Sequence, residues 1–244
     1  EFREGYTTVT YPGLERVNRY QPAVHQARLV DVKVAPGLRA GYVMGSGDEV
    51  PEALEQLGVR VEMLQAADLA TGNLGQFDVI LLGIRAYAAR SDVKTYNPRL
   101  LDYVKNGGTL VVQYQTQEYD NNYGPFPYTQ TPRAEEVSEE DSPVEILDPQ
   151  NQVFHFPNKI TRADFDGWVE QRGSKFFKTW DAQWKPLVET HDTGQELQKG
   201  VWLEARYGKG RYIYCALAWY RQLPYAVPGA VRLVANLLSL PKAK

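Results

Sequence analysis

Cysteine is almost absent from this chain of 244 residues, in which Cys215 is the single example. One thiol excludes an internal disulfide and any zinc site built on cysteine pairs. Histidine is scarce as well: His25, His155 and His191 lie far apart and form no metal-binding motif. We therefore expect no metal site.

Long apolar runs and an excess of positive charge are also missing. No run approaches the roughly 20 apolar residues that a membrane-spanning helix needs. The 27 basic residues are outnumbered by 30 acidic ones, and no basic stripe is interleaved with aromatic side chains. We therefore expect neither a membrane span nor a nucleic-acid partner.

The first 37 residues differ in pattern from the rest of the chain. Residues 6–11 are rich in Tyr and Thr, and at 30–34 valine alternates with polar residues, as in a half-buried strand. The chain opens with neither an initiator Met nor a signal peptide, so we expect it to be part of a longer protein. We interpret residues 1–37 as an arm or linker from a preceding β-domain, and 38–244 as the main domain.

The main domain alternates predicted strands and helices. Strands are predicted at 38–44, 59–64, 78–82, 109–114 and 212–217, with helices beginning near Val50, Asn97 and Gly229. The strand at 78–82 is almost wholly apolar, as in a sheet that is covered on both faces. This alternation with short links predicts an α/β fold with a doubly wound, mostly parallel sheet of the flavodoxin-like kind.

Two segments leave alternatives open. Residues 115–161 form a long, irregular loop with six acidic and no basic residues between Glu135 and Glu145. Such a charge run is usually a solvated surface, although a loop in this place can also act as a lid. An aromatic cluster further along the chain suits either core packing or a platform for a sugar ring; its members are Trp168, Phe176, Phe177, Trp180 and Trp184.

Candidate binding residues follow the predicted strands. Ligands of open α/β sheets bind beyond the carboxyl ends of the strands, where the strand order reverses. The residues predicted to line this crevice are Asp48, Glu49, Arg85, Tyr87, Tyr114, Gln115 and Arg221. Two arginines and two acids suit a hydroxyl-rich or anionic ligand, but these groups can equally pair with one another.

Motifs for a cofactor or a nucleophile are missing. The loop at 45–47 (GSG) lacks the third glycine of a dinucleotide fingerprint and the Gly-Lys-Ser/Thr of a P-loop. Asp48 and Glu49 would repel a phosphate there, so we expect no nucleotide cofactor. Cys215 lies in an apolar strand without a glycine elbow, as a buried, inert thiol does, and no Gly-x-Ser-x-Gly is present. We therefore expect no catalytic residue.

Four motifs in order resemble the class I glutamine amidotransferase-like superfamily, particularly its trehalose-utilisation (ThuA-like) branch. They are FDVILL at 77–82, LDYVKNGGTLVV at 101–112, YGKGRYIY at 207–214 and GAVRL at 229–233. The resemblance covers about residues 38–240 and implies the same α/β fold.

A closer resemblance, over nearly the whole chain, is to the C-terminal region of large bacterial proteins. Their N-terminal part is a PIG-L (LmbE-like) zinc-dependent N-acetylglucosaminyl deacetylase. The matching segments are YVMGSGDEVPEA at 42–53, FPNKIT at 156–161, DFDGWV at 164–169, RQLP at 221–224 and PGAVRLVANLL at 228–238. The resemblance implies a bacterial parent protein, outside the cytoplasm if that parent carries a signal peptide.

Two departures from these families limit the chemistry. Residues 113–115 (Gln-Tyr-Gln) stand where amidotransferases carry their cysteine nucleophile, in the turn after the strand that follows Gly107-Gly108. The His-Pro-Asp-Asp metal motif of the deacetylase is absent from this sequence. The resemblance therefore implies deacetylation by the parent protein and not by these residues.

The leading hypothesis is a non-catalytic accessory domain of a PIG-L/LmbE-type protein. It would bind or position a carbohydrate or glycoconjugate, with the upstream domains of the same polypeptide as partners. One alternative is a hydrolase or sugar-modifying enzyme with Glu49 or a tyrosine as base, which predicts a buried carboxylate of raised pKa. Another is a structural interaction domain whose crevice is filled by its own long loop.

Overall fold

The computed structural model describes residues 3–24, 27–119, 123–130 and 135–243, which form two compact units, Glu1–Val30 and Asp31–Lys244. In the first unit, β1 (Glu4–Val9) and β2 (Val17–Pro22) pair as an antiparallel hairpin. Almost every residue of the hairpin is exposed, and the Tyr6 and Tyr20 rings face each other across the strands.

The strand predicted at 30–34 is wrong. This stretch is extended but pairs with no strand among the described residues. Instead, Lys33 N–H donates to the Asn158 side chain at 2.8 Å, and Ala35 N–H donates to the Ser239 hydroxyl at 3.0 Å. Side chains of the main unit thus satisfy backbone groups that the alternating valines had suggested would enter a sheet.

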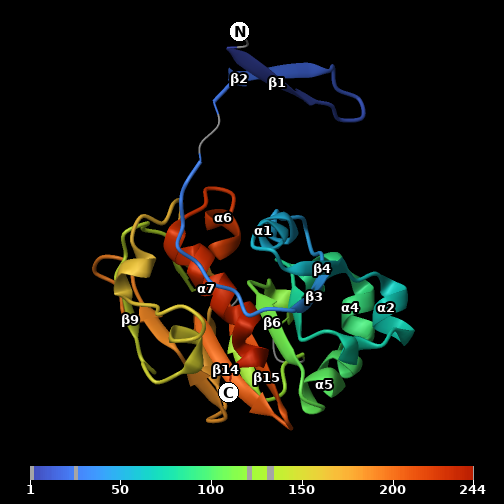
Figure 1. Ribbon diagram of the computed structural model, residues 1–244, viewed down its shortest axis with the longest axis vertical. Coiled ribbons are helices and arrows are strands. Elements are labelled where there is room, and N and C mark those ends of the chain that lie inside the picture. Colours follow the sequence, from blue (N-terminus) through green and yellow to red (C-terminus); the bar gives the residue numbers. More distant parts are fainter. Residues whose placement is uncertain (1–2, 25–26, 120–122, 131–134, 244) are drawn as a thin grey trace. The chain divides into compact units, whose positions relative to one another are not determined.

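A mostly parallel sheet forms the centre of the second unit, as the sequence predicted (Figure 1). Among the described residues it has seven strands in the order β12-β14-β15-β6-β5-β3-β4. Their bounds are β3 (Arg39–Val43), β4 (Arg60–Met63), β5 (Val79–Leu82), β6 (Thr109–Gln113), β12 (Trp184–Pro186), β14 (Trp202–Tyr207) and β15 (Gly210–Cys215). Neighbours from β15 to β4 are parallel, whereas β14 and β12 extend the sheet with antiparallel pairing.

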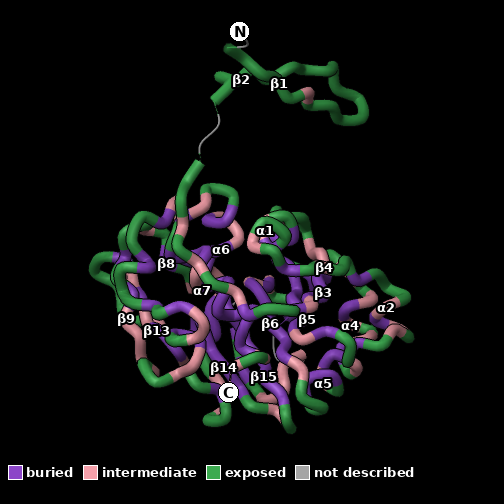
Figure 2. Tube along the Cα trace, viewed as in Figure 1, coloured by how far each residue is buried: buried purple, intermediate pink, exposed green. Residues whose placement is uncertain are grey.

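Helices follow the parallel strands, and α7 lies along the sheet (Figure 1). They are α1 (Val50–Gln56), α2 (Ala66–Thr71), α3 (Ala86–Ala89), α4 (Ser91–Thr95), α5 (Asn97–Lys105), α6 (Trp219–Gln222) and α7 (Pro228–Ser239). Proline in the first turns of α1, α5 and α7 suits these starts, because the N–H that it lacks has no partner there. Every residue of β5, β6 and β15 is buried, which explains the wholly apolar sequence of β5 (Figure 2). No helix of the described residues is both long and apolar enough to cross a bilayer.

The segment at 115–161, expected to be an irregular loop, contains three short strands. These are β7 (Tyr128–Gln130), β8 (Glu136–Val137) and β9 (Val144–Ile146), which pair with β11 (Phe177–Trp180), β10 (Gly173–Ser174) and β13 (Val188–Thr190). Two single-turn helices also lie among the described residues of this segment, η2 (Gln117–Tyr119) and η3 (Gln152–Phe154). Others lie outside it, at η1 (Leu74–Gln76), η4 (Arg162–Phe165) and η5 (Leu240–Lys242). Each strand is too short to show alternation, and each partner lies more than 30 residues away.

The predicted aromatic cluster packs in the core. Phe177 stacks on Tyr128 with ring centroids 4.1 Å apart and on Tyr214 at 4.3 Å, and Trp184 meets Phe177 edge-on. Trp168, Phe176, Phe177 and Trp184 are all buried, whereas Trp180 is partly exposed. The four buried rings therefore offer no face to a sugar.

Candidate functional site

The strand order reverses at β3, which has β4 on one side and β5 on the other. The segments that follow β3 and β5 are in contact: the Ser46 N–H donates to the Ile84 carbonyl at 2.9 Å. A Cβ at Gly45 would lie only 2.0 Å from that carbonyl oxygen. Glycine is therefore required at position 45. The edge of the sheet at which the strand order reverses is where ligands bind in open α/β folds.

A hydrogen-bonded chain joins three strand ends at this point. Gln113 at the end of β6 donates to the Tyr42 hydroxyl at 2.8 Å, and Tyr42 in β3 donates to Asp48 at 2.6 Å. Asp48 also accepts the N–H groups of Val50 at 3.1 Å and Ile84 at 3.4 Å. The predicted site residue Asp48 is therefore occupied in tying β3, β5 and β6 together.

Partial burial raises the pKa of Asp48, and the hydrogen bond from Tyr42 only partly opposes this. Because the pKa of Asp48 is higher in the folded than in the unfolded chain, the wild type is most stable relative to Asp48→Asn below the unfolded pKa of about 3.9. This stability difference is lost as the pH rises through the pKa of Asp48 in the folded protein. Carboxyl-carbon NMR titration should place Asp48 above an ordinary aspartate. Asp92 is the matched control, because its hydrogen bond with Arg90 lowers the pKa of that carboxyl. An Asp48 that titrates at or below Asp92 would contradict the prediction.

Arg85 follows β5 in the left-handed backbone region, with φ of 57°. A non-glycine residue in this region is uncommon, and its strained backbone costs of order 1–3 kcal/mol. Strain of this kind is often found at functional sites. Its N–H donates to the Tyr114 carbonyl at 3.0 Å, which fixes the turn. Arg85 is exposed, and within the described residues its guanidinium has no hydrogen-bond or ion-pair partner.

Tyr114 adjoins Arg85 through the hydrogen bond that its carbonyl accepts, and Tyr220, the neighbour of Arg221 in sequence, lies against its ring. Burial raises the pKa of Tyr114, while the positive charges of Arg85 and Arg221 act in the opposite direction. The Tyr114 ring stacks on Tyr220, with centroids 6.0 Å apart and planes 16° from parallel. Arg221 donates to the Tyr220 hydroxyl at 3.2 Å and pairs with Glu170.

Tyr87 and Gln115 do not face the solvent. Both are fully buried. The Tyr87 hydroxyl donates to Asn97 at 2.6 Å, and Tyr123 lies against its ring at 4.6 Å between centroids. Gln115 accepts the Tyr87 N–H and donates to the Gly83 carbonyl. The prediction that these two side chains line a crevice therefore needs correction: Gln115 bonds the backbone of the turn after β5, and the Tyr119 and Tyr123 rings pack against Tyr87.

The remaining predicted groups lie apart from this cluster. Glu49 is exposed at the start of α1, and none of its described contacts joins it to Arg85 or Tyr114. Cys215 is buried at the end of β15, where burial raises the pKa of its thiol to about 12. No three His, Cys, Asp or Glu side chains in the described ranges are close enough to hold a metal ion, and His25 lies outside those ranges.

Tyr220 and Glu118 were not among the predicted crevice residues. Tyr220 adjoins the predicted Arg221, but its stacking on Tyr114 depends on β15 lying beside β6. Glu118 accepts a hydrogen bond from Thr116 at 2.5 Å, which is the main cause of its lowered pKa, and Arg85 contributes weakly. An acid four residues after Tyr114 was the signal that could have indicated it.

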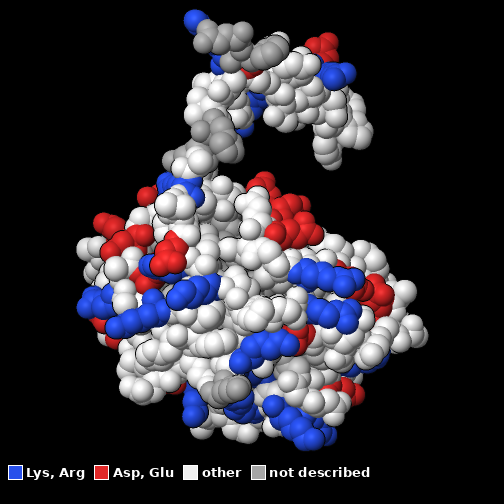
Figure 3. Space-filling model, in the orientation of Figure 1, with Lys and Arg blue, Asp and Glu red and all other residues white. Residues whose placement is uncertain are grey.

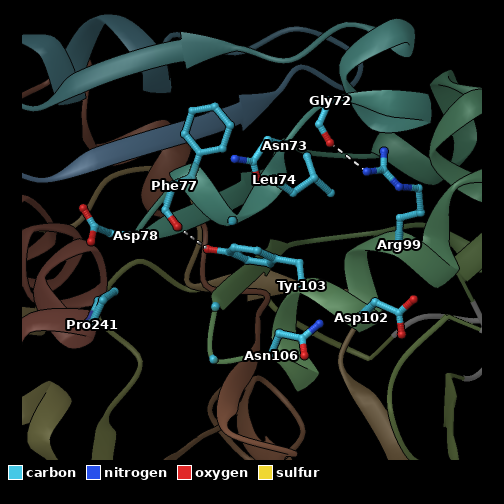
Figure 4. A pocket seen from close by; sticks show the side chains of 13 residues that line it. Gly72, Asn73, Leu74, Phe77, Asp78, Arg99, Asp102, Tyr103, Asn106 and Pro241 are labelled. Carbon is cyan, nitrogen blue, oxygen red and sulfur yellow. Dashed lines mark hydrogen bonds between the residues drawn. The ribbon is translucent and has the colours of Figure 1, made fainter.

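Four cavities lined by described residues lie elsewhere in the molecule. One of them, of about 650 Å³, is at the amino ends of β5 and β6 (Figure 4). Its most prominent polar groups already have partners: Arg99 donates to carbonyls at the end of α2, including Gly72 at 2.7 Å, and Tyr103 donates to the Phe77 carbonyl. None of the four is lined by a predicted site residue.

No protein-family model and no curated protein matches the sequence. A cytoplasmic protein from Salmonella typhimurium has a similar structure over 97% of this chain and 94% of its own, with a TM-score of 0.53 and 12% identity. A β-galactosidase from Bacillus circulans sp. alkalophilus matches 84% of this chain and 31% of its own, with a TM-score of 0.49 and 14% identity. The first likeness shows the fold alone, and the second is too distant to carry an argument.

Proposed function

We propose that this chain is a non-catalytic accessory domain that binds a carbohydrate or glycoconjugate at the carboxyl edge of its parallel sheet. The observation that carries the proposal is the stacking of the Tyr114 ring on Tyr220, with Arg85 hydrogen-bonded through its backbone to Tyr114 and Arg221 hydrogen-bonded to the Tyr220 hydroxyl. Aromatic rings offer a flat apolar face, and guanidinium groups offer several hydrogen-bond donors in a fixed plane. Together they suit a sugar ring and its hydroxyl or acidic substituents.

Within this proposal the fold is the doubly wound, flavodoxin-like fold of class I glutamine amidotransferase-like domains. Numbered in chain order, the five parallel strands β3, β4, β5, β6 and β15 follow the order 2-1-3-4-5, which supports the assignment. The parent would be a PIG-L/LmbE-type deacetylase protein, in which this domain positions the glycoconjugate for an upstream catalytic domain.

The residues where the resembling amidotransferases carry their nucleophile support an accessory role. Tyr114 follows β6 in the turn where the resembling amidotransferases carry cysteine. The thiol of Cys215 is buried in the neighbouring strand, and its raised pKa keeps it protonated at neutral pH. Binding and positioning are therefore the roles that these residues support.

Isothermal titration of the chain with N-acetylglucosamine and its short oligomers tests this function. We expect saturable binding that Arg85→Ala weakens about tenfold, because a hydrogen bond to a charged donor is lost. Tyr114→Phe should cause a smaller loss, since the ring remains. Arg60→Ala, an exposed arginine on β4, is the matched control and should bind as the wild type does. Absence of saturable binding, or normal affinity in Arg85→Ala, would overturn the proposal.

The enzyme alternative predicted a carboxylate of raised pKa beside a polar partner, and Asp48 fits that description. Both of its oxygens, however, accept hydrogen bonds that hold strand ends together. Turnover of an acetylated amino sugar by the wild-type chain and its loss in Asp48→Asn would favour the alternative.

A further inference from the structure

A hollow lies at the opposite edge of the sheet from the candidate site. Arg211 is near the amino end of β15, whereas Arg221 follows the carboxyl end of the same strand. Two cavities, of about 520 Å³ and about 350 Å³, meet here and share Gln152, Arg206 and Arg211 in their walls. Their volumes are in the range of small-molecule sites.

A buried ion pair forms part of the wall. Arg211 and Glu204 have side chains only 7% and 8% exposed, and Arg211 Nη1 lies 2.9 Å from Glu204 Oε2. Asn151 also donates to Glu204 at 3.3 Å, and Gln152 accepts from Arg211 at 3.3 Å. The desolvation cost of burying an ion pair is often as large as the attraction between its charges, so the pair adds little net stability. We therefore considered a binding role for this pair, which lies in the wall of an open hollow.

The charge of the lining is unbalanced. Glu204 already neutralises Arg211, and Arg206 lies 3.5 Å from the other Glu204 oxygen with 63% of its side chain exposed. Lys185 and Lys209 are exposed and add positive charge, while Asp148 adds one negative charge. Figure 3 shows Lys and Arg along the lower border of the main unit, where the ends of β14 and β15 lie in Figure 1. The hollow thus favours an anion.

Amide side chains supply the remaining polar lining. They come from two segments and are Gln150, Asn151, Gln152 and Gln183. An amide offers both a donor and an acceptor, which matches a hydroxyl group, itself a donor and an acceptor. Gln150, Gln183 and Lys185 have no side-chain hydrogen-bond partner within the described part of the chain.

We propose that this hollow is a separate binding site for a small anionic sugar, whose hydroxyls meet the amides and whose acidic group meets Arg206 and Lys185. The acidic group can be the carboxylate of a sugar acid or the phosphate of a sugar phosphate. The site uses none of the residues of the carbohydrate site at the carboxyl edge and stands independently of it.

Titration of the ¹⁵N-labelled chain with glucuronate, glucose 6-phosphate and glucose tests the proposal. We expect saturable shifts at 150–152, 183–185 and 204–211 with at least one anion, and glucose about tenfold weaker or inactive. The tighter anion identifies the preferred acidic group. Saturable binding by neither anion, equal affinity for glucose, or shifts confined to the turns after β5 and β6 would overturn it.

Exposed substitutions provide the second measurement. The double variant Lys185→Gln/Arg206→Gln should fold normally, because both side chains are exposed, and should weaken the tighter anion about tenfold. Arg60→Gln is the matched control and should leave the affinity unchanged. A double variant that melts with the wild type and binds the anion equally well would refute the site.

Discussion

Arg211→Ala is expected to lower the free energy of unfolding by about 3–5 kcal/mol, the usual cost of leaving a buried charge unpaired. The substitution removes the guanidinium 2.9 Å from Glu204, whose side chain is 8% exposed. Asn151 and Arg206, at 3.3 Å and 3.5 Å from the carboxylate oxygens, replace only part of the lost interaction. Urea unfolding followed by tryptophan fluorescence measures the change.

Replacing both partners distinguishes the attraction between the two charges from the cost of leaving one charge buried and unpaired. The double variant Arg211→Met/Glu204→Leu should recover most of the loss, since apolar residues of similar volume often match or exceed a buried ion pair. Arg206→Ala, which removes the mostly exposed partner of the same glutamate, should cost under about 1 kcal/mol. If Arg211→Ala proved as mild as Arg206→Ala, the pair would not be buried in solution.

Asn236→Ala is expected to cost about 3–4 kcal/mol. The Asn236 amide is fully buried in α7 and donates to the carbonyls of Val153 at 2.7 Å and Asn158 at 2.8 Å. Its oxygen accepts from the Asn158 backbone and side chain. Each buried group left without a partner costs about 1–3 kcal/mol, and alanine leaves several at once.

Ser239→Ala is the matched control on the same helix. It removes a single hydrogen bond, from Ala35 N–H, and should cost about 1 kcal/mol. Hydrogen exchange adds a second readout, because Asn158 also binds the N–H and carbonyl of Lys33. Exchange at Lys33 should accelerate in Asn236→Ala, and unchanged protection there would argue against the connection.

The five parallel strands of the sheet could be predicted because their cause is local, whereas the antiparallel strands β12 and β14 were not predicted. The apolar run at β5 and the Gly107-Gly108 pair before β6 indicate buried strands and a helix stop. The short strands β7, β8 and β9 could not be predicted, since each forms only by pairing with a distant segment. The valines at 30–34 suggested a strand because their alternation is local. The side chains of Asn158 and Ser239, which are distant along the chain, instead bond the backbone of Lys33 and Ala35.

The candidate site was partly predictable. Parallel strands end at one edge, so Arg85, Tyr114 and Arg221 were expected together; Arg85 bonds the Tyr114 carbonyl, and Tyr220 links the Tyr114 ring to Arg221. The rule names residues near strand ends but not the direction in which their side chains point. Tyr87 and Gln115 point inward, where they bind Asn97 and Gly83.

The sequence alone predicted a mostly parallel α/β sheet and a set of residues at one edge of it. It could do so because apolar periodicity, helix-ending glycines and the order of elements are local features of the chain. Tertiary structure alone decided which of these residues stay accessible, and it brought Glu204, Arg211 and the amides of 150–152 to one hollow. Burial and long-range pairing depend on segments that are distant along the chain, so no local pattern records them.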